Sequence, residues 1–457
     1  MNDLFETIAA IATPPGAGGI GIIRVSGKDA FAVAGRVFRA NSGDSLDSLP
    51  GFTARLGKAR DADGALLDEA ICLVFHAPKS YTGEDVAEIM CHGGELVCDA
   101  VLRAVCDAGA VMADRGEFTR RAYLNGRLSL TQAEAVCDVI NAASRQGERA
   151  AASLVGGALA RKLDEMKGEI QSLQAQITAC IDFPEEDVDE MDAGELFTRL
   201  NALVAELAAL KGSFTLGADL IRGIPAAIVG SPNVGKSTLL NLLAGAPKAL
   251  VTPIAGTTRD VLEQRVRLGG ATLLLADTAG IRESDDEIER LGIELALRRA
   301  NEASFIFAVF DSSRPLCADD YRLIERLHNR RVLAVVNKTD LAPAFEAAEI
   351  ERAFPEIVFV SANDPSSLRE LDSATARVLK TEALDPNAPL LATERQYRCA
   401  HLALEAAQEA ANASAHTTLD VVYALLSEAH SSLCEMSGEN AAESVLDEVF
   451  SRFCVGK

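Results

Sequence analysis

Long stretches on both sides of the middle of this chain place apolar residues at helical intervals. In residues 131–181, which are rich in Ala, Leu, Glu, Lys and Gln, apolar positions recur every three or four residues and form one stripe. The stripe consists of Leu163, Met166, Ile170, Leu173 and Ile177. Residues 186–212, 392–413 and 419–453 have a similar pattern. The spacing predicts helices in all four stretches.

Short apolar runs in the first 120 residues predict strands instead. Such runs occur in 7–27, where they flank a Pro-Gly-rich turn, and in 70–78 and 86–94. We therefore expect residues 1–120 to form an α+β domain.

Proline separates the middle of the chain from its flanks. Ten of the fifteen prolines lie in 225–389, whereas only Pro184 interrupts 79–224 and none follows Pro389. Because proline breaks helices, the proline-poor flanks can be helical, while the segment between them alternates strand and helix. The expected fold is multidomain, α+β and α/β, with a central unit inserted into a helical domain. The predicted boundaries are 1–120 for the first domain, 121–219 and 381–457 for the two helical segments, and 220–380 for the inserted unit.

Composition and charge narrow the classes of function. The 457 residues carry a formal net charge of −23, which argues against nucleic-acid binding over the whole surface but allows a local basic patch or a basic partner. No apolar run reaches the length of a membrane span, and the first residues do not have the pattern of a signal peptide. The ten cysteines form no CxxC pair, so we expect reduced thiols in a cytoplasmic protein, without zinc or disulfides.

The clearest chemical signal is Gly-Ser-Pro-Asn-Val-Gly-Lys-Ser at 230–237, the pattern of a phosphate-binding P-loop. Gly230 and Gly235 let the backbone wrap around phosphates with its N–H groups pointing inward. A strand precedes the loop, and a helix is expected to begin near Lys236 with its positive end facing the phosphates. Lys236 is expected to reach the β- and γ-phosphates, and the Ser237 hydroxyl to ligate magnesium.

Four further motifs follow the P-loop in the order that GTPases use. They are GTTRD (256–260), DTAG (277–280), NKTD (337–340) and the pair Ser361-Ala362. The Asp277 carboxylate can hold the magnesium shell, and Asp340 can accept two hydrogen bonds that guanine offers and adenine does not. The motifs together predict a Ras-like P-loop domain that binds and hydrolyses GTP. The residues expected around the nucleotide from these motifs are Asn233, Val234, Gly235, Lys236, Ser237, Thr238, Gly256, Thr257, Thr258, Asp277, Thr278, Ala279, Gly280, Asn337, Lys338, Thr339, Asp340, Ser361, Ala362 and Asn363.

The residues alone leave the hydrolytic step open. Ile281 follows DTAG where Ras-like GTPases place a glutamine that orients water, and isoleucine cannot do this. Glu283, Glu287 and Glu289 are candidates for the task, or belong only to a solvated surface. The amide oxygen of Asn233 can ligate a monovalent cation against the phosphates, although an asparagine that only stabilises a loop is the more common case.

The remaining segments resemble one family. TPPGAGGIGIIRVSG (13–27), SYTGEDVAEIMCHGG (80–94), GEFTRRAYLNGRLSLTQAEAV (116–136) and the terminal FCVGK (453–457) are similar to MnmE, also called TrmE, a family of tRNA-modification GTPases. The resemblance covers essentially the whole chain, including the order of its parts. It implies an amino-terminal folate-binding domain that also forms a homodimer, a helical domain and an inserted GTPase domain.

The resemblance also implies chemistry and partners. Family members act with the FAD-dependent flavoprotein MnmG, in a heterotetramer, and build an aminomethyl or carboxymethylaminomethyl group at carbon 5 of the wobble uridine in certain tRNAs. The one-carbon unit is linked to 5-formyltetrahydrofolate or a related tetrahydrofolate. GTP hydrolysis requires magnesium and potassium, and the two GTPase domains of the dimer meet across potassium. Neither DNA nor a membrane is implied.

By match to the family motifs, the resemblance assigns roles to single residues. Ser237 and Thr258 hold magnesium, Lys236 is catalytic, and Glu289 is oriented to the attacking water through another water. Cys454 in the tail is a further catalytic candidate whose chemical step stays open. Potassium is assigned to Asn233, Thr252, Ile254 and Thr257. The resemblance thereby also places the run Thr252, Pro253, Ile254 and Ala255 around the nucleotide. Folate is assigned to Arg24, Glu88, Arg127 and Lys457, with Arg127 where lysine is expected and Ala17 where arginine is frequent.

Two alternatives compete with this reading. A regulatory GTPase switch that assembles ribosomes fits the nucleotide motifs equally well, but not the amino-terminal segments or the tail. A folate-dependent one-carbon transferase regulated by GTP is the second.

Residues 381–457 contain 4 Lys or Arg and 12 Asp or Glu, a formal charge of −8. We therefore expect weak, strongly salt-sensitive tRNA binding by this chain, with the flavoprotein supplying most of the affinity.

Overall fold

The computed structural model of the protein describes residues 6–142, 144–182, 193–245, 264–275, 301, 303–344, 348–379, 385 and 388–457. The chain divides into two compact units. The first combines Met1–Cys137, Ala160–Leu207 and Arg398–Lys457, and the second combines Asp138–Leu159 and Ala208–Tyr397. Among the described residues, no helix is both long and apolar enough to cross a membrane.

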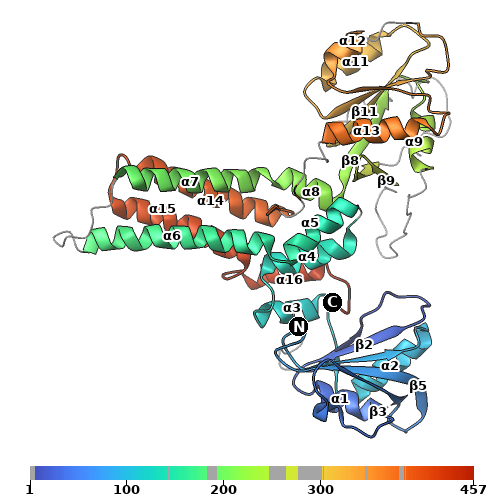
Figure 1. Ribbon diagram of the computed structural model, residues 1–457, viewed down its shortest axis with the longest axis vertical. Coiled ribbons are helices and arrows are strands. Elements are labelled where there is room, and N and C mark those ends of the chain that lie inside the picture. Colours follow the sequence, from blue (N-terminus) through green and yellow to red (C-terminus); the bar gives the residue numbers. More distant parts are fainter. Residues whose placement is uncertain are drawn as a thin grey trace. The chain divides into compact units, whose positions relative to one another are not determined.

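A seven-stranded sheet lies in the amino-terminal part of the first unit (Figure 1). Its strands are β1 (Ile8–Ile11), β2 (Gly21–Ser26), β3 (Phe38–Ala40), β4 (Thr53–Arg60), β5 (Leu66–Phe75), β6 (Val86–Cys91) and β7 (Val111–Met112), in the spatial order β3-β4-β5-β6-β2-β1-β7. Helices α1 (Ala30–Val37) and α2 (Glu95–Asp107) pack on one face, and a short 3-10 helix, η1 (Leu46–Ser48), joins this core. Ile23 and Val25 point into the core, so the intervening Arg24 faces the other side. The predicted α+β class is confirmed.

Helices from two distant segments of the chain pack together in the first unit. They are α6 (Ala158–Asp182), α7 (Ala193–Gly212), α14 (Glu394–Ala413) and α15 (Leu419–Ser437), the long helices of Figure 1. Arg199 Nε lies 2.7 Å from Glu169 Oε1 and joins α7 to α6, while Gln174 donates to Ser427 at 2.8 Å and joins α6 to α15. The predicted stripe on α6 is confirmed, because its five residues are at most 1% exposed. Four leucines of α7 are at most 3% exposed: Leu196, Leu200, Leu203 and Leu207.

Two of the predicted helical stretches are divided into shorter helices, and a glycine lies at one break in each. Residues 131–181 contain α4 (Leu130–Asn141), α5 (Arg145–Val155) and α6, with Gly157 at φ 84° just before α6. Residues 419–453 contain α15 and α16 (Glu443–Ser451), which packs against α3 (Glu117–Leu124). Gly438 ends α15 with φ 98°, and a Cβ there would lie 2.6 Å from Leu130 Cβ. The left-handed backbone and the close packing both require glycine, so the helix ends there.

A six-stranded sheet forms the centre of the second unit. Its strands are β8 (Ile224–Gly230), β9 (Gln264–Leu268), β10 (Ala271–Leu275), β11 (Phe305–Asp311), β12 (Val332–Asn337) and β13 (Ile357–Phe359), in the order β13-β12-β11-β8-β10-β9. All neighbours are parallel except β9 and β10. Helices α9 (Lys236–Ala244) and α13 (Ser367–Leu379) cover one face, and α11 (Ala318–Leu327) and α12 (Ala348–Ala353) cover the other.

The sheet confirms the α/β class and the strands predicted on either side of the motifs. The run 224–230 is β8, the run 332–336 lies in β12, and a helix begins at Lys236. The run 271–277 is strand as far as the structure describes it, in β10. Helices α5 and α8 (Phe214–Arg222) also belong to this unit and contact each other.

Candidate functional site

The carboxyl ends of four parallel strands meet at one edge of the second sheet. β8 ends at Gly230, β11 at Asp311 and β12 at Asn337, and Ser361 follows β13. In open α/β sheets this edge is where ligands bind, because the loops after neighbouring strands converge there. The sheet topology therefore brings the P-loop, NKTD and Ser361-Ala362 together, as their order along the sequence predicts.

The P-loop has the backbone conformation that its glycines allow. Gly235 caps α9 with φ 98°, and a Cβ there would lie only 2.2 Å from Asn337 Nδ2, so no larger residue fits. Asn233 also has a positive φ, 62°, and is exposed. We call the part of the P-loop around Asn233 its crest. Ser237, in the first turn of α9, is exposed as well. The first turn of the helix offers unpaired backbone N–H groups to an anion.

The side chain of Lys236 folds back over the P-loop. Its Nζ donates to the carbonyl oxygens of Gly230 at 2.9 Å and Ser231 at 2.8 Å. Burial lowers the pKa of this ammonium, and the negative charge of Asp320 opposes that shift. Among the residues that the structure describes, the direct hydrogen-bond partners of this cation are therefore neutral carbonyl oxygens.

NKTD docks directly onto the P-loop. Asn337 donates from Nδ2 to Val234 O at 2.8 Å, and its Oδ1 accepts from Ala362 N at 2.9 Å. Lys338 donates from Nζ to Asn233 O at 2.8 Å. One asparagine thus joins three motifs, while Asp340 stays exposed and free to meet a base. The neighbouring candidates Thr339 and Asn363 are exposed too, and Thr238 and Ser361 are half-buried.

Several predicted nucleotide residues lie outside the described residues. These are the first switch and potassium candidates, the DTAG motif and the catalytic glutamate: Thr252, Pro253, Ile254, Ala255, Gly256, Thr257, Thr258, Asp277, Thr278, Ala279, Gly280 and Glu289. Their roles stay predictions.

Two buried aspartates beside the P-loop belong to none of the motifs. Asp311 and Asp320 are 6% and 1% exposed, and each contacts the loop directly or through one side chain. A signal for Asp311 exists in the sequence: it ends the apolar run FIFAVFD as Asp277 ends ATLLLAD. Asp320 has no such signal, because it lies in a polar helix whose packing the sequence does not reveal.

A second polar site lies on the outer face of the amino-terminal sheet. Arg24 and Glu88 are direct partners on β2 and β6, and Arg24 Nε lies 2.8 Å from Glu88 Oε1. Their side chains are 15% and 13% exposed. The Arg24 guanidinium also lies 5.5 Å from the ring centres of Tyr81 and Phe118, within cation–π distance.

The carboxyl-terminal tail adds its last residues to this site. Val455 forms a β-bridge with Arg115, and the carbonyl of Gly456 accepts from Arg24 Nη1 at 3.4 Å. Gly456 has φ 95°, and a Cβ there would lie 2.3 Å from Ile11 O, so only glycine fits against β1. Burial and the Arg24 charge lower the pKa of Lys457, and the Glu88 charge offsets only part of this shift. Lys457 directly follows Gly456, whose carbonyl contacts Arg24, so it lies close to the Arg24–Glu88 pair.

Two other predicted residues lie at the margin of this site. Arg127 is exposed and lines a cavity of about 390 Å³ with Phe52, Phe75, Lys79, Ser80 and Tyr81. Tyr81 thus belongs both to the cavity and to the surroundings of Arg24. Cys454 is exposed on the tail, where its carbonyl oxygen contacts Gly116 N at 3.5 Å. The structure brings Arg24, Glu88 and Lys457 together, and the role of Cys454 stays a prediction.

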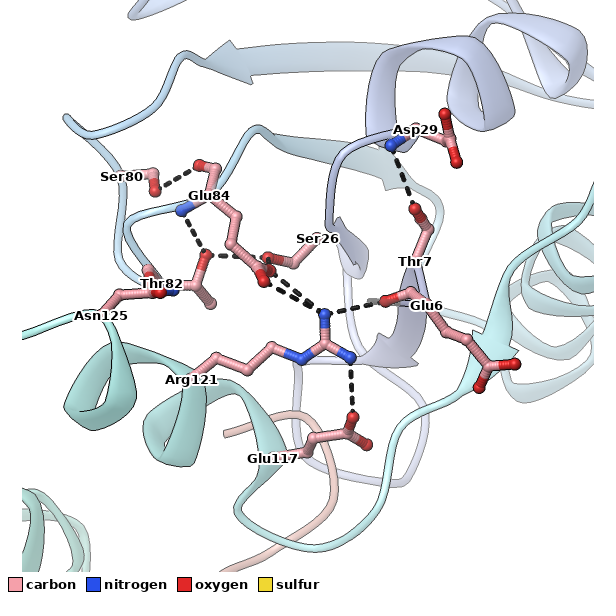
Figure 2. A network of polar contacts seen from close by, with 10 residues as sticks. All are labelled: Glu6, Thr7, Ser26, Asp29, Ser80, Thr82, Glu84, Glu117, Arg121 and Asn125. Atoms are coloured by element: carbon pink, nitrogen blue, oxygen red, sulfur yellow. Dashed lines mark hydrogen bonds and ion pairs between the residues drawn. The ribbon is translucent and has the colours of Figure 1, made fainter. Parts of the chain in front are cut away.

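A buried arginine fixes the loop that carries Tyr81 (Figure 2). Arg121, on α3, is 2% exposed and points at Glu84, Glu117 and the carbonyl of Glu6. Glu117 lies 2.9 Å and Glu84 3.3 Å from its guanidinium nitrogens. Ser26 donates to Glu84 and contacts Thr82, and Asn125 donates to the Thr82 carbonyl. This network joins α3 and β2 to the loop between β5 and β6.

Comparison with solved structures finds GTPases. The chain is similar to the G domain of the T. maritima FeoB iron transporter, with 25% identity, a TM-score of 0.26 and coverage of 34% of this chain and 98% of that chain. It is also similar to Era in complex with MgGDPNP and nucleotides of 16S ribosomal RNA, with 30% identity, a TM-score of 0.26 and coverage of 40% and 66%. Both TM-scores are too low to support a structural argument.

Comparison with known sequences reaches over nearly the whole chain. Residues 7–127 match the family described as GTP-binding protein TrmE N-terminus, and residues 130–454 match the MnmE helical domain. The tRNA modification GTPase MnmE of Symbiobacterium thermophilum is 40% identical over 456 residues, and that of Acetivibrio thermocellus is 37% identical over 459. Each alignment covers 99% of this chain and 99% of the relative. The chain therefore belongs to the MnmE family of tRNA modification GTPases.

Proposed function

We propose that this chain is a cytoplasmic, potassium-dependent GTPase that acts with the flavoprotein MnmG on the wobble uridine of certain tRNAs. The two proteins add an aminomethyl or carboxymethylaminomethyl group at carbon 5, using a folate one-carbon unit. Membership of the tRNA modification GTPase family supports the reaction class and the tRNA substrate. The observation that carries the GTPase assignment is the docking of Asn337 and Lys338 onto the P-loop.

The P-loop geometry explains how the chain acts on GTP. Lys236 gives up two neutral carbonyl partners and gains charged phosphate oxygens, which stabilise an ammonium in a partly buried place. The N-terminus of α9 adds its N–H groups. Ser237, Thr258 and the Asp277 carboxylate would hold magnesium, which would neutralise negative charge on the phosphates. Charge stabilisation and positioning of this kind lower the barrier to phosphoryl transfer.

Potassium activation rests on Asn233. The structure supports this assignment in that the side chain is exposed at the crest of the P-loop, while the backbone is held in a left-handed conformation. The other proposed ligands, Thr252, Ile254 and Thr257, and the water-positioning Glu289 come from the family motif alone.

The outer face of the amino-terminal sheet fits a folate. A folate has a pterin edge with amino and imino donors, an aromatic ring system and an acidic glutamate tail. Glu88 offers a carboxylate, Tyr81 a ring, and Arg24, Lys457 and Arg127 offer positive charge. These residues bind and orient the ligand. A tetrahydrofolate supplies the one-carbon unit when bound.

The same sheet face supports a homodimer. Leu56 and Ile71 are direct partners on β4 and β5, point away from the helices and are 52% and 41% exposed. Phe52 and Leu66 on the same hairpin are 65% and 55% exposed. Large apolar side chains that gather on one face mark a surface for another protein, and we assign this face to a second copy of the chain.

Modified tRNA tests the proposal. The purified chain is incubated with its flavoprotein partner, GTP, 5-formyltetrahydrofolate and unmodified tRNA, and the wobble nucleoside is analysed by mass spectrometry. A new carbon-5-substituted uridine is expected, and Lys236→Ala should abolish it. GTP hydrolysis without any new nucleoside would favour a regulatory GTPase of ribosome assembly. A new nucleoside in the absence of the partner would favour a folate-dependent transferase.

A further inference from the structure

Two buried carboxylates lie next to the P-loop without belonging to any GTPase motif. Asp311 ends β11, and Asp320 lies in the first turn of α11. Every carboxylate oxygen of both residues accepts at least one hydrogen bond. Buried charges are costly unless they are paired in this way, so their contacts show what they hold.

Asp320 holds the beginning of the P-loop. Its Oδ1 accepts from Ser231 Oγ at 2.5 Å, and its Oδ2 accepts from Cys317 N at 2.9 Å and lies 3.0 Å from Arg314 Nη1. Ser231 is the first residue after β8, and its carbonyl oxygen is one of the two that bind Lys236. Asp320 thus fixes the loop where the phosphate-binding lysine is anchored, and its negative charge favours the ammonium form of Lys236.

Asp311 holds the crest of the P-loop through one intermediate. Its Oδ2 accepts from Lys338 Nζ at 2.6 Å, and its Oδ1 accepts from the N and Oγ of Ser313 at 2.9 and 2.6 Å. Lys338 has φ 64°, a conformation that is strained for a residue with a side chain. The same Nζ donates to the carbonyl of Asn233, itself at φ 62°. Without Asp311, nothing among these contacts keeps the lysine pointed at that carbonyl.

We propose that Asp311 and Asp320 are positioning residues that preorganise the P-loop for guanine nucleotides, Asp320 at Ser231 and Asp311 through Lys338 at Asn233. The proposal rests on GTP binding by this chain. The P-loop is then held by residues of β11 and α11 as well as by NKTD. Because Asn233 is held by the same lysine as the base-recognition motif, binding of the base and the position of the crest are coupled.

Nucleotide affinity in the folded protein distinguishes positioning from simple stabilisation. Asp311→Asn and Asp320→Asn keep the shape of the side chain but remove its charge. Asp319→Asn is the matched control, because Asp319 is the adjacent residue of α11 and its ion pair within the described part of the chain is with the exposed Arg322. The dissociation constant of a fluorescent GDP analogue is measured on the full-length chain with magnesium, together with the thermal unfolding midpoint without nucleotide.

Asp311→Asn and Asp320→Asn should each raise the dissociation constant about tenfold or more, because a hydrogen bond to a charged group is lost. Asp319→Asn should raise it less than twofold. Unchanged affinity in folded Asn variants overturns the proposal. If the unsubstituted chain does not bind GDP, the GTPase assignment itself fails.

A double-mutant cycle tests the route through Lys338. If Asp311 acts through this lysine, adding Asp311→Asn to Lys338→Ala changes affinity little further, whereas independent effects multiply. Multiplying effects would overturn the route. If the Asn variants do not fold, Ser231→Ala and Ser313→Ala remove one hydroxyl each. A rise of roughly threefold is expected for each, and no change would contradict the proposal.

Discussion

The nucleotide site and the amino-terminal polar site are built in opposite ways. The nucleotide site uses short contiguous motifs, each placed by the end of a parallel strand, and much of its surface is backbone. The amino-terminal site uses single side chains from β2, β6, a loop and the last residue of the chain. Arg24 and Lys457 are neighbours in space only because the tail bridges to Arg115 and packs its glycine on β1.

This difference decides what each site tolerates. Parallel strand ends fix the nucleotide motifs through the sheet, so a change of one side chain alters chemistry more than position. The amino-terminal site depends on long-range contacts, above all those of Arg121, so its geometry depends on the stability of its domain. Substitutions can therefore affect one site and spare the other.

The largest expected effect separates the two sites completely. Lys236→Ala removes the charge held at the P-loop, and we expect GTP hydrolysis to fall roughly 10³-fold, because a preorganised cation stabilises the transferring phosphoryl group. Binding of 5-formyltetrahydrofolate, measured by isothermal titration calorimetry, should stay within twofold. A parallel loss of folate binding would contradict the independence of the sites.

Arg121→Met tests the amino-terminal scaffold. The substitution removes the buried positive charge that pairs with Glu84 and Glu117. We therefore expect the domain to lose about 3 kcal/mol or more of unfolding free energy. Arg55→Gln is the control, because Arg55 and its partner Asp44 are 34% and 39% exposed and such surface pairs contribute little to stability. Hydrogen exchange of residues 80–85 measures the effect. Equal protection in both variants would show that the Arg121 network is not what holds the loop.

Arg24→Gln and Lys457→Gln sharpen the assignment of the second site. Each removes one charge near Glu88, and we expect the dissociation constant for 5-formyltetrahydrofolate to rise roughly 10- to 100-fold. GTP hydrolysis should change less than twofold in both. Arg322→Gln, which removes an exposed charge from α11, is the control for net charge. Unchanged folate affinity in both variants would place the ligand elsewhere.

Low pH should reduce the unfolding free energy of the second unit, by less than the substitutions described above. Burial opposes ionisation of Asp320, but hydrogen bonds from Cys317 and Ser231 outweigh it and lower the pKa of this carboxyl. A carboxyl whose folded-state pKa is lowered stabilises the fold fully above the unfolded value of about 3.9, and this contribution is lost as pH falls through the folded pKa. Urea unfolding should therefore show a difference between the unsubstituted chain and Asp320→Asn that is constant above about pH 5 and shrinks below pH 4. A difference that grows on acidification would contradict the sign.

The sequence predicts the parts of the fold that depend on local pattern. The leucine stripe of α7 and the strand before the P-loop lie as their spacing predicts, because periodicity reports directly which side is buried. Glycines at 157 and 438 divide stretches that appear continuous in composition. Strands β3 and β4 have no clear sequence signal. Lys58 and Arg60 of β4 alternate with small residues, and only the pairing of β4 with β5 and of β3 with β4 makes these segments strands.

The two sites also differ in how far the sequence alone predicts them. Asn337 and Lys338 could be placed at the P-loop from the motif order alone, because the loops of a parallel sheet converge at one edge. The pairing of Arg24 with Glu88 and the approach of Lys457 needed the family resemblance, since strand register and the path of a tail are long-range properties. Asp320 was missed because only packing brings it to Ser231.

The most direct test of the account is GTP hydrolysis in potassium against sodium, at matched ionic strength, for the unsubstituted chain and Asn233→Ala. Asn241→Ala, at an exposed position of α9, serves as the control. We expect stimulation by potassium of roughly tenfold or more that is lost in Asn233→Ala and kept in Asn241→Ala. Equal rates in the two salts would contradict it, because Asn233 would then only stabilise the P-loop and the potassium-dependent mechanism would fall.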